Sequence, residues 1–178
     1  MANEANIFKQ KFYYSCLVTS LLMISGAKNQ ELEEKIFFDG AKRDYDFYLN
    51  SMLASFVKNT GKSLEVFVDN KFLTGKLSVN LEKYSDKINI VHKQINPDLI
   101  AETLKTGPFV IYLDDNYLGD YSHASHFVVV NSVRKDGRFQ ILDPANGKRK
   151  YLTANKLSES VESLKKHIKI CPIIIRVK

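Results

Sequence analysis

Cysteine is scarce in this sequence, and the two cysteines that occur, Cys16 and Cys171, stand far apart. Domains that depend on disulfides usually carry several closely spaced cysteines, so a disulfide framework is not predicted. No pair of cysteines or histidines has the short spacing of a zinc site, and we expect neither a metal nor another cofactor. A reducing cytoplasm is the expected compartment.

Long apolar runs and internal repeats are missing as well. No run reaches the roughly 18 residues that a transmembrane helix needs, so we expect a soluble protein without a membrane span. The 178 residues include no linker or low-complexity tract, and 44% of them are hydrophobic, which is enough to bury one core. A single domain covering residues 1–178 is therefore predicted.

Positive charge exceeds negative charge, and the formal net charge is +6. Short basic clusters occur at residues 148–150 and 165–167, but neither is interleaved with aromatic residues as in a nucleic-acid-binding motif. Both clusters fall in or beside amphipathic elements. We interpret them as solvated faces and expect no nucleic-acid partner.

The first half of the chain has mainly helical patterns, in which apolar residues recur at three- and four-residue steps. Helices are predicted at residues 30–38, 45–60 and 97–106. Asn96 is placed to cap the last of these, and Gly107 to end it. Residues 64–68 alternate like a strand, whereas residues 69–93 are predicted to form a loop with short strands or turns.

The second half changes to strand patterns that are rich in β-branched and aromatic residues. The predicted strands are residues 109–113, 126–133, 138–142, 148–152 and 172–177. Thr153 is placed to cap a last helix that runs through Leu164. The expected fold class is α+β, with an N-terminal helical half packed on a C-terminal antiparallel sheet.

Residues 10–24 combine a glutamine, a cysteine and an apolar helical pattern. Cys16 falls in the first turn of the predicted helix, with Ser15 as N-cap and Gly26 as terminator. A helix N-terminus favours the thiolate, which is the nucleophilic form of cysteine. The side-chain amide of Gln10 is placed to complete an oxyanion hole with a backbone N–H of the helix start. The stretch therefore predicts a nucleophile and an oxyanion donor.

Two other interpretations of residues 10–24 stay open at this point. An isolated cysteine in an apolar helix is more often a small buried hydrophobe, so only a matching base elsewhere decides for catalysis. Alternatively, the stretch is a secretory signal peptide, because Lys9 and Lys11 precede the apolar run and small residues follow at 25–27. Glu4 and the hydroxyl side chains within the run argue against a signal peptide.

A matching base and an orienting acid are predicted in the strand half. The pair Asp136-Gly137 is a strong hairpin signal between two strand patterns that contain His126 and Asp143. If the hairpin loop holds an even number of residues, Asp143 shares a face of the sheet with His126. Asp143 would then orient the His126 ring, whose other nitrogen takes the proton of Cys16, as in a catalytic triad.

These residues carry a resemblance that extends over about residues 10–160. Its motifs are Gln10, Cys16, Leu-Leu-Met-Ile at 21–24, Gly-Pro-Phe-Val-Ile-Tyr at 107–112, His-Phe-Val-Val at 126–129 and Asp-Pro-Ala-Asn-Gly at 143–147. Together they resemble the bacteriocin-processing, double-glycine leader peptidases. The resemblance implies a papain-like cysteine peptidase fold and a peptide or amide substrate. It also implies the site residues: Cys16 as nucleophile, His126 as base, Asp143 as orienting residue and Gln10 as oxyanion donor.

The sequence departs from that family next to the nucleophile. The family usually has aspartate before and glycine after the cysteine, whereas this chain has Ser15 and Leu17. No transporter or nucleotide-binding segment is recognised in the sequence, so we expect a free-standing peptidase. The resemblance therefore implies the chemistry more strongly than the substrate.

Three functions stay open from sequence. The first is hydrolysis of a peptide or amide bond through an acyl-enzyme on Cys16, and the second is transfer of the same acyl group to an amine. The third is an inactive peptide-binding module, which is favoured if Leu17 blocks the cleft. The reactive thiol is expected to be Cys16, because Cys171 lies in an apolar strand. The base is expected to be His126, because His123 lies in a polar, exposed segment.

Overall fold

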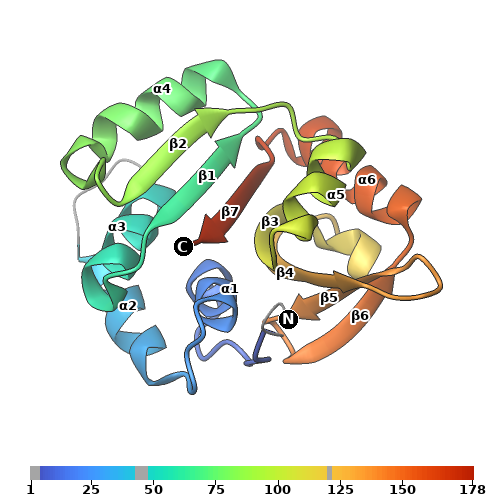
Figure 1. Ribbon diagram of the computed structural model, residues 1–178, viewed down its shortest axis with the longest axis horizontal. Helices are drawn as coiled ribbons and strands as arrows, with labels where there is room; N and C mark the ends of the chain where they lie inside the picture. The colour runs from blue at the N-terminus through green and yellow to red at the C-terminus, as the bar shows by residue number, and fades with distance from the viewer. Residues whose placement is uncertain (1–4, 43–47, 120–121) are drawn as a thin grey trace.

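The computed structural model describes residues 5–42, 48–119 and 122–178. Its centre is a seven-stranded sheet in the order β2-β1-β7-β3-β4-β5-β6 (Figure 1). The strands are β1 (Leu64–Val68), β2 (Ile88–His92), β3 (Phe109–Asp114), β4 (Ser125–Val133), β5 (Phe139–Asp143), β6 (Lys148–Leu152) and β7 (Ile173–Val177). Each strand predicted in the second half is present, with ends that differ by at most one residue.

The strands of the second half pair antiparallel with one another, as predicted, but the sheet extends further to β1 and β2, which run parallel. The other neighbouring strands are antiparallel. Parallel neighbours need a crossover connection, and α4 (Lys71–Asn80) supplies it. The prediction of a loop at residues 69–93 missed this helix because α4 lies on the surface, buries only Leu77 and has little apolar periodicity.

The other α-helices are α1 (Cys16–Ile24), α2 (Glu31–Ala41), α3 (Tyr48–Thr60), α5 (Pro97–Lys105) and α6 (Ala154–Ser163). Short helical segments are η1 (Glu82–Tyr84), η2 (Asp115–Leu118) and the π-helical η3 (Leu164–Ile168). Asn96 and Thr153 cap α5 and α6 through their side chains, as predicted. Tyr45, where the third helix was predicted to begin, lies outside the described residues. None of the helices in the described part of the chain combines the length and apolarity needed to cross a bilayer.

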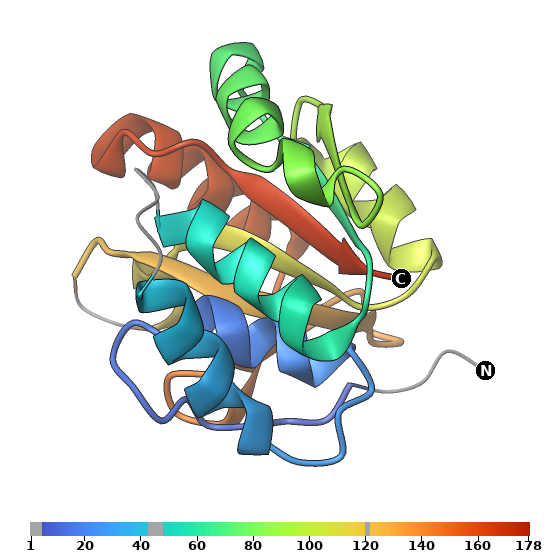
Figure 2. The ribbon, with the colours of Figure 1, turned by 90° about the vertical axis from the view of Figure 1, so that its left-hand side faces the viewer.

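Both faces of the sheet are covered by helices. Apolar residues of α1, α2 and α3 pack on one face, and those of α5 and α6 pack on the other. Alternate residues of β4 divide between the two layers: Phe127 and Val129 join the first, whereas Val128 and Val130 join the second. Figure 1 shows α5 and α6 together across the sheet from α1, and Figure 2 shows α2 and α3 side by side.

Helix α1 is buried on nearly all sides, which fixes the position of Cys16. Residues 17–23 are all buried, as expected for a helix that is apolar all round and packs inside a core. This helix is part of the folded domain, which is inconsistent with a cleaved signal peptide. The helix ends at Ile24, and Gly26 follows with a φ of 78°, the left-handed conformation that glycine adopts after a helix, so the predicted terminator is confirmed. Cys16, its first residue, is partly exposed.

Candidate active site

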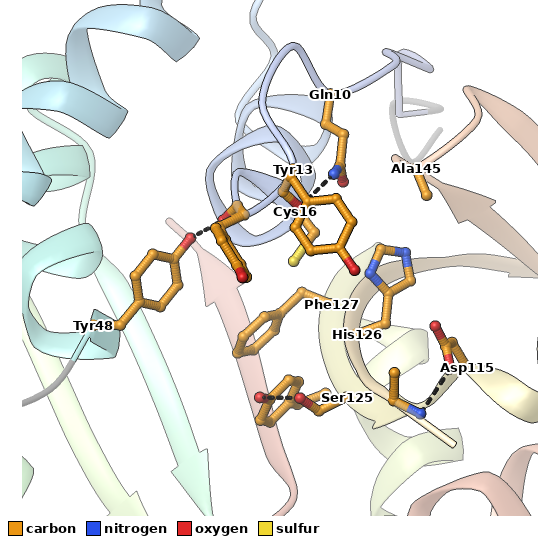
Figure 3. Close-up of a pocket in the computed structure, with 12 residues that line it drawn as sticks. Gln10, Tyr13, Cys16, Tyr48, Asp115, Ser125, His126, Phe127 and Ala145 are labelled. Atoms are coloured by element: carbon orange, nitrogen blue, oxygen red, sulfur yellow. Dashed lines mark hydrogen bonds between the residues drawn. The ribbon is translucent and has the colours of Figure 1, made fainter. Parts of the chain in front are cut away.

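A pocket of about 420 Å³ brings together the N-terminal segment, the start of α1 and the start of β4. Three of the residues proposed from sequence line it: Gln10, Cys16 and His126. The rest of its lining consists of Tyr13, Tyr14, Tyr48, Tyr112, Asp115, Ala124, Ser125, Phe127 and Ala145. Figure 3 shows the Cys16 sulfur and the His126 ring on facing sides of this pocket.

The N-terminus of α1 carries no side-chain cap beside Cys16. Ser15 occupies the predicted N-cap position, but its side chain makes no capping hydrogen bond. Its hydroxyl lies 2.6 Å from Oε1 of Glu33, a fully buried residue of α2. The predicted capping role of Ser15 is therefore wrong. Because Glu33 binds this hydroxyl, the Ser15 side chain does not occupy the first-turn N–H groups of α1.

The two departures from the family pattern beside Cys16 do not obstruct the pocket. Ser15 and Leu17 are both fully buried, with exposed fractions of 0%. Leu17 packs in the apolar layer between α1 and the sheet and is not among the residues that line the pocket. The blocked cleft that would have favoured an inactive binding module is therefore not found.

His126 and Asp143 form a buried hydrogen-bonded pair next to Cys16. Nε2 of His126 lies 2.9 Å from Oδ1 of Asp143, so the ring is held by one nitrogen and Nδ1 is left for the cysteine. Burial alone lowers the pKa of an imidazole, but the bond to Asp143 and the nearby Cys16 sulfur raise the pKa of His126 to about 9. The imidazolium is therefore the favoured form at neutral pH.

The alignment of Asp143 with His126 depends on a β-bulge. The last paired residues of the hairpin are Val133 and Phe139, so its loop holds an odd number of residues, contrary to the condition set from sequence. That register alone would place Asp143 on the opposite face from His126. The register shifts at Asn131, after which Leu142 lies opposite Val129, and the shift returns Asp143 to the face of His126.

Asp143 is fully buried and accepts hydrogen bonds on both oxygens. Besides His126, Oδ1 accepts the backbone N–H of Ala145 at 2.9 Å. Oδ2 lies 3.0 Å from Nδ2 of Asn146 and 2.9 Å from Nζ of Lys150. Burial raises the pKa of a carboxyl, but the His126 and Lys150 bonds outweigh it and hold the pKa of Asp143 well below its usual range. The carboxylate is therefore ionised and can only accept, so Nε2 of His126 carries its hydrogen.

Gln10 is held at the pocket by its backbone and its side chain. Its N–H donates to the C=O of Pro144 at 2.7 Å, which joins the N-terminal segment to the turn after Asp143. Its Nε2 donates to the C=O groups of Phe12 and Tyr13 at 3.0 and 2.8 Å, and its Oε1 is buried without a partner. Gln10 thus lines the pocket, but both N–H groups of its amide bind the loop that precedes Cys16, so a substrate oxygen would have to replace one of these two carbonyls.

Aromatic side chains that the sequence reasoning did not single out form one wall of the pocket. Tyr112 and Phe127 stack with ring centroids 3.9 Å apart, and the Tyr112 hydroxyl lies 2.7 Å from Oγ of Ser125. The hydroxyl of Tyr48 donates to the C=O of Tyr14 on the same side. These residues come from separate segments, and no spacing in the sequence relates them. The wall suits an uncharged part of a ligand.

His123 and Cys171 both lie away from this pocket. Nδ1 of His123 pairs with Oδ2 of Asp114 at 2.6 Å, and its ring stacks on His167. Cys171 precedes β7 and lines a separate depression, where burial raises the pKa of its thiol to about 11. Tyr121, in the polar segment that holds His123, lies outside the described residues. Across the described ranges, no three His, Cys, Asp or Glu side chains are arranged to hold a metal ion.

Comparison with known proteins identifies a family. The model of the Peptidase C39 family matches residues 72–160, which is half of the chain. His126 and Asp143 fall within the matched residues, whereas Gln10 and Cys16 precede them. No curated protein matches the chain. The mixed fold, with helices over a seven-stranded sheet, is that of a papain-like peptidase of this family. The chain therefore belongs to the Peptidase C39 family, the cysteine peptidases that process bacteriocins after a double glycine.

Proposed function

We propose that the protein cleaves a peptide or amide bond through an acyl-enzyme on Cys16. The observation that carries this proposal is the meeting of Cys16 with the His126–Asp143 pair at one pocket. Gln10 lines the same pocket and is the proposed oxyanion donor. The family supports the coarser statement that the protein is a cysteine peptidase.

In the first half of the proposed reaction, Cys16 is acylated. Nδ1 of His126 holds the thiol proton as part of the imidazolium, and the Cys16 thiolate attacks the carbonyl carbon of the substrate. The negative charge that develops on the carbonyl oxygen is stabilised by a backbone N–H at the start of α1 and by Gln10, whose amide exchanges one of its two loop carbonyls for this oxygen. When the C–N bond breaks, the imidazolium of His126 returns the proton to the leaving amine. Asp143 keeps the ring in the required tautomer throughout.

In the second half, water hydrolyses the thioester. His126 takes a proton from the water, and the hydroxide attacks the acyl carbon and expels the Cys16 thiolate, which is reprotonated through His126. An amine in place of water would give acyl transfer by the same steps. We place hydrolysis first because the family consists of peptidases. A peptide with Gly-Gly before the scissile bond is the first substrate to test.

Alkylation distinguishes a catalytic thiol from a structural one. Iodoacetamide near pH 6 is expected to modify Cys16 before Cys171, because only a thiolate reacts and His126 and the α1 N-terminus favour one at Cys16. The raised pKa of Cys171, about 11, keeps that thiol protonated. Mass spectrometry of the digested protein identifies the adduct. Preferential labelling of Cys171 would contradict the assignment of the nucleophile.

Gln10→Ala tests the oxyanion donor. Because the contact strengthens only as charge develops on the carbonyl oxygen, kcat is expected to fall by about 10²–10³ with little change in KM. The rate of alkylation of Cys16 should stay at the wild-type value. Steady-state kinetics and alkylation of the same preparation give both results.

Gln30→Ala is the matched control for this change. The Gln30 side chain also donates to a backbone C=O of the N-terminal segment, that of Lys9, but it does not line the pocket. If anchoring of this segment were the only role of Gln10, both variants would lose activity to a similar degree. A Gln10→Ala protein that turns over as fast as the wild type would rule out the oxyanion role.

A further inference from the structure

Lys150 of β6 binds the carboxylate that orients His126. Its Nζ lies 2.9 Å from Oδ2 of Asp143, and the two side chains are 20% and 1% exposed. In the β5–β6 pairing Lys148 stands opposite Asp143, whereas Lys150 stands opposite Ile141. Lys150 is therefore a diagonal neighbour of Asp143 on the same face of the sheet, at a separation that a long side chain spans.

The other groups that bind Asp143 do not supply a permanent positive charge next to its carboxylate. Its two neutral donors are the backbone N–H of Ala145 and the amide of Asn146, and His126 becomes charged only when it holds a second proton. Lys150 is thus the permanently charged donor among the groups that bind this carboxylate within the described residues. A buried carboxylate without a paired cation is costly, and it binds a neighbouring imidazolium more tightly.

The four side chains form a row of alternating charge when Cys16 is a thiolate: sulfur, imidazolium, carboxylate and ammonium. The titratable groups that act on His126 are Cys16 from α1 and Asp143 from β5, and those that act on Asp143 are His126 and Lys150. Lys150 binds Oδ2 of the carboxylate whose Oδ1 binds His126. It therefore weakens the hold of Asp143 on the imidazolium, which must give up its proton in every cycle.

We propose that Lys150 is a positioning residue that binds Asp143 and thereby limits the basicity of His126. This inference rests on the proposed function of Cys16, His126 and Asp143. It assigns a role to one residue of the basic cluster at 148–150, which the sequence had indicated to be a solvated face. Lys148 and Arg149 are exposed, as that interpretation expects, but Lys150 is not.

The test compares Lys150→Met with Lys148→Met. Each variant loses one positive charge from the same strand and the same face, but only Lys150 contacts Asp143. Titration of the imidazole nitrogens by NMR gives the pKa of His126, with its signal assigned among the four histidines by means of His126→Ala. We expect Lys150→Met to raise this pKa by about one unit, because a cation two hydrogen bonds away is removed while Asp143 stays ionised.

The controls separate this role from a structural one. Lys150→Arg, which retains the charge, is expected to give the wild-type value, and Lys148→Met to change it by less than about 0.3 unit because that charge is exposed. Thermal melts establish that each variant is folded, and Lys150→Gln replaces Lys150→Met if the latter does not fold. An unchanged His126 pKa in the folded neutral variant, or an equal shift in Lys148→Met, would overturn the proposal.

The alkaline limb of kcat/KM provides a second readout of the same role. In Lys150→Met the pKa of this limb should rise by the same amount as the pKa of His126 measured by NMR. In Lys148→Met it should stay at the wild-type value. Because the NMR titration needs no turnover, the role of Lys150 is tested even if the protein cleaves no peptide. Conversely, if the protein cleaves a peptide but the pKa of His126 does not depend on Lys150, the proposed function stands and this inference fails.

Discussion

Cys16→Ala is expected to lower the rate of peptide hydrolysis by on the order of 10⁶-fold, the size of loss seen when the nucleophile is removed from a triad hydrolase. The proposed acyl-enzyme forms on Sγ of Cys16, and no other thiol lines the pocket. Residual cleavage would come only from substrate binding and the oxyanion donors. Hydrolysis of a Gly-Gly peptide, followed by chromatography of the products, measures the loss.

Cys171→Ala is the matched control, because it removes the other thiol of the chain. Cys171 lies in a separate depression with Asp69 and Lys165, so its loss should leave kcat and KM within about two-fold of the wild type. Incubation with substrate followed by acid quench should trap an acyl adduct in the wild type and in Cys171→Ala. Full activity in Cys16→Ala would refute the proposed mechanism.

His126→Ala is expected to cost nearly as much as the loss of Cys16, because nucleophile and base act as one unit. Without the imidazole there is no group to take the thiol proton or to protonate the leaving amine. Alkylation of Cys16 near pH 6 should also slow, since the thiolate loses its paired imidazolium. Both rates can be followed on one preparation of the variant.

The pH profile of the wild type follows from the same residue. The pKa of His126 is raised from 6.5 to about 9, so the imidazolium persists through neutral pH and is lost as the pH rises through about 9. We therefore expect kcat/KM to decline on the alkaline side near pH 9. The variant His123→Ala should show the same alkaline decline and the wild-type rate, because His123 binds Asp114 outside the pocket. A loss of activity confined to His123→Ala would move the base to that residue.

Local patterns in the sequence were enough to locate the parts of the candidate site. The apolar helix after Cys16, the terminator Gly26 and the strand that begins near His126 all depend on interactions between neighbours in the chain. These elements appear in the structure at the predicted places. The α+β class followed from the change of period between the two halves of the chain.

Features that depend on partners distant in sequence were beyond such patterns. Helix α4 was missed because its stability rests on packing beside β1 and β2 and on the cap at Asn70, with a weak apolar pattern of its own. The capping bond of Ser15 failed because Glu33, from another helix, binds its hydroxyl. In both cases a contact with residues distant in sequence decided the local structure.

The amino-acid sequence by itself determined which residues we propose for the chemistry: a cysteine at a helix start, a histidine at a strand start and an aspartate at the end of the next strand. Only the tertiary structure decided how they meet. An odd hairpin loop combined with a bulge at Asn131 sets the face of Asp143, and a diagonal contact across β5 and β6 brings Lys150 to it. The physical reason is that a register shift of one residue reverses the face of every following side chain, and no local pattern encodes that shift.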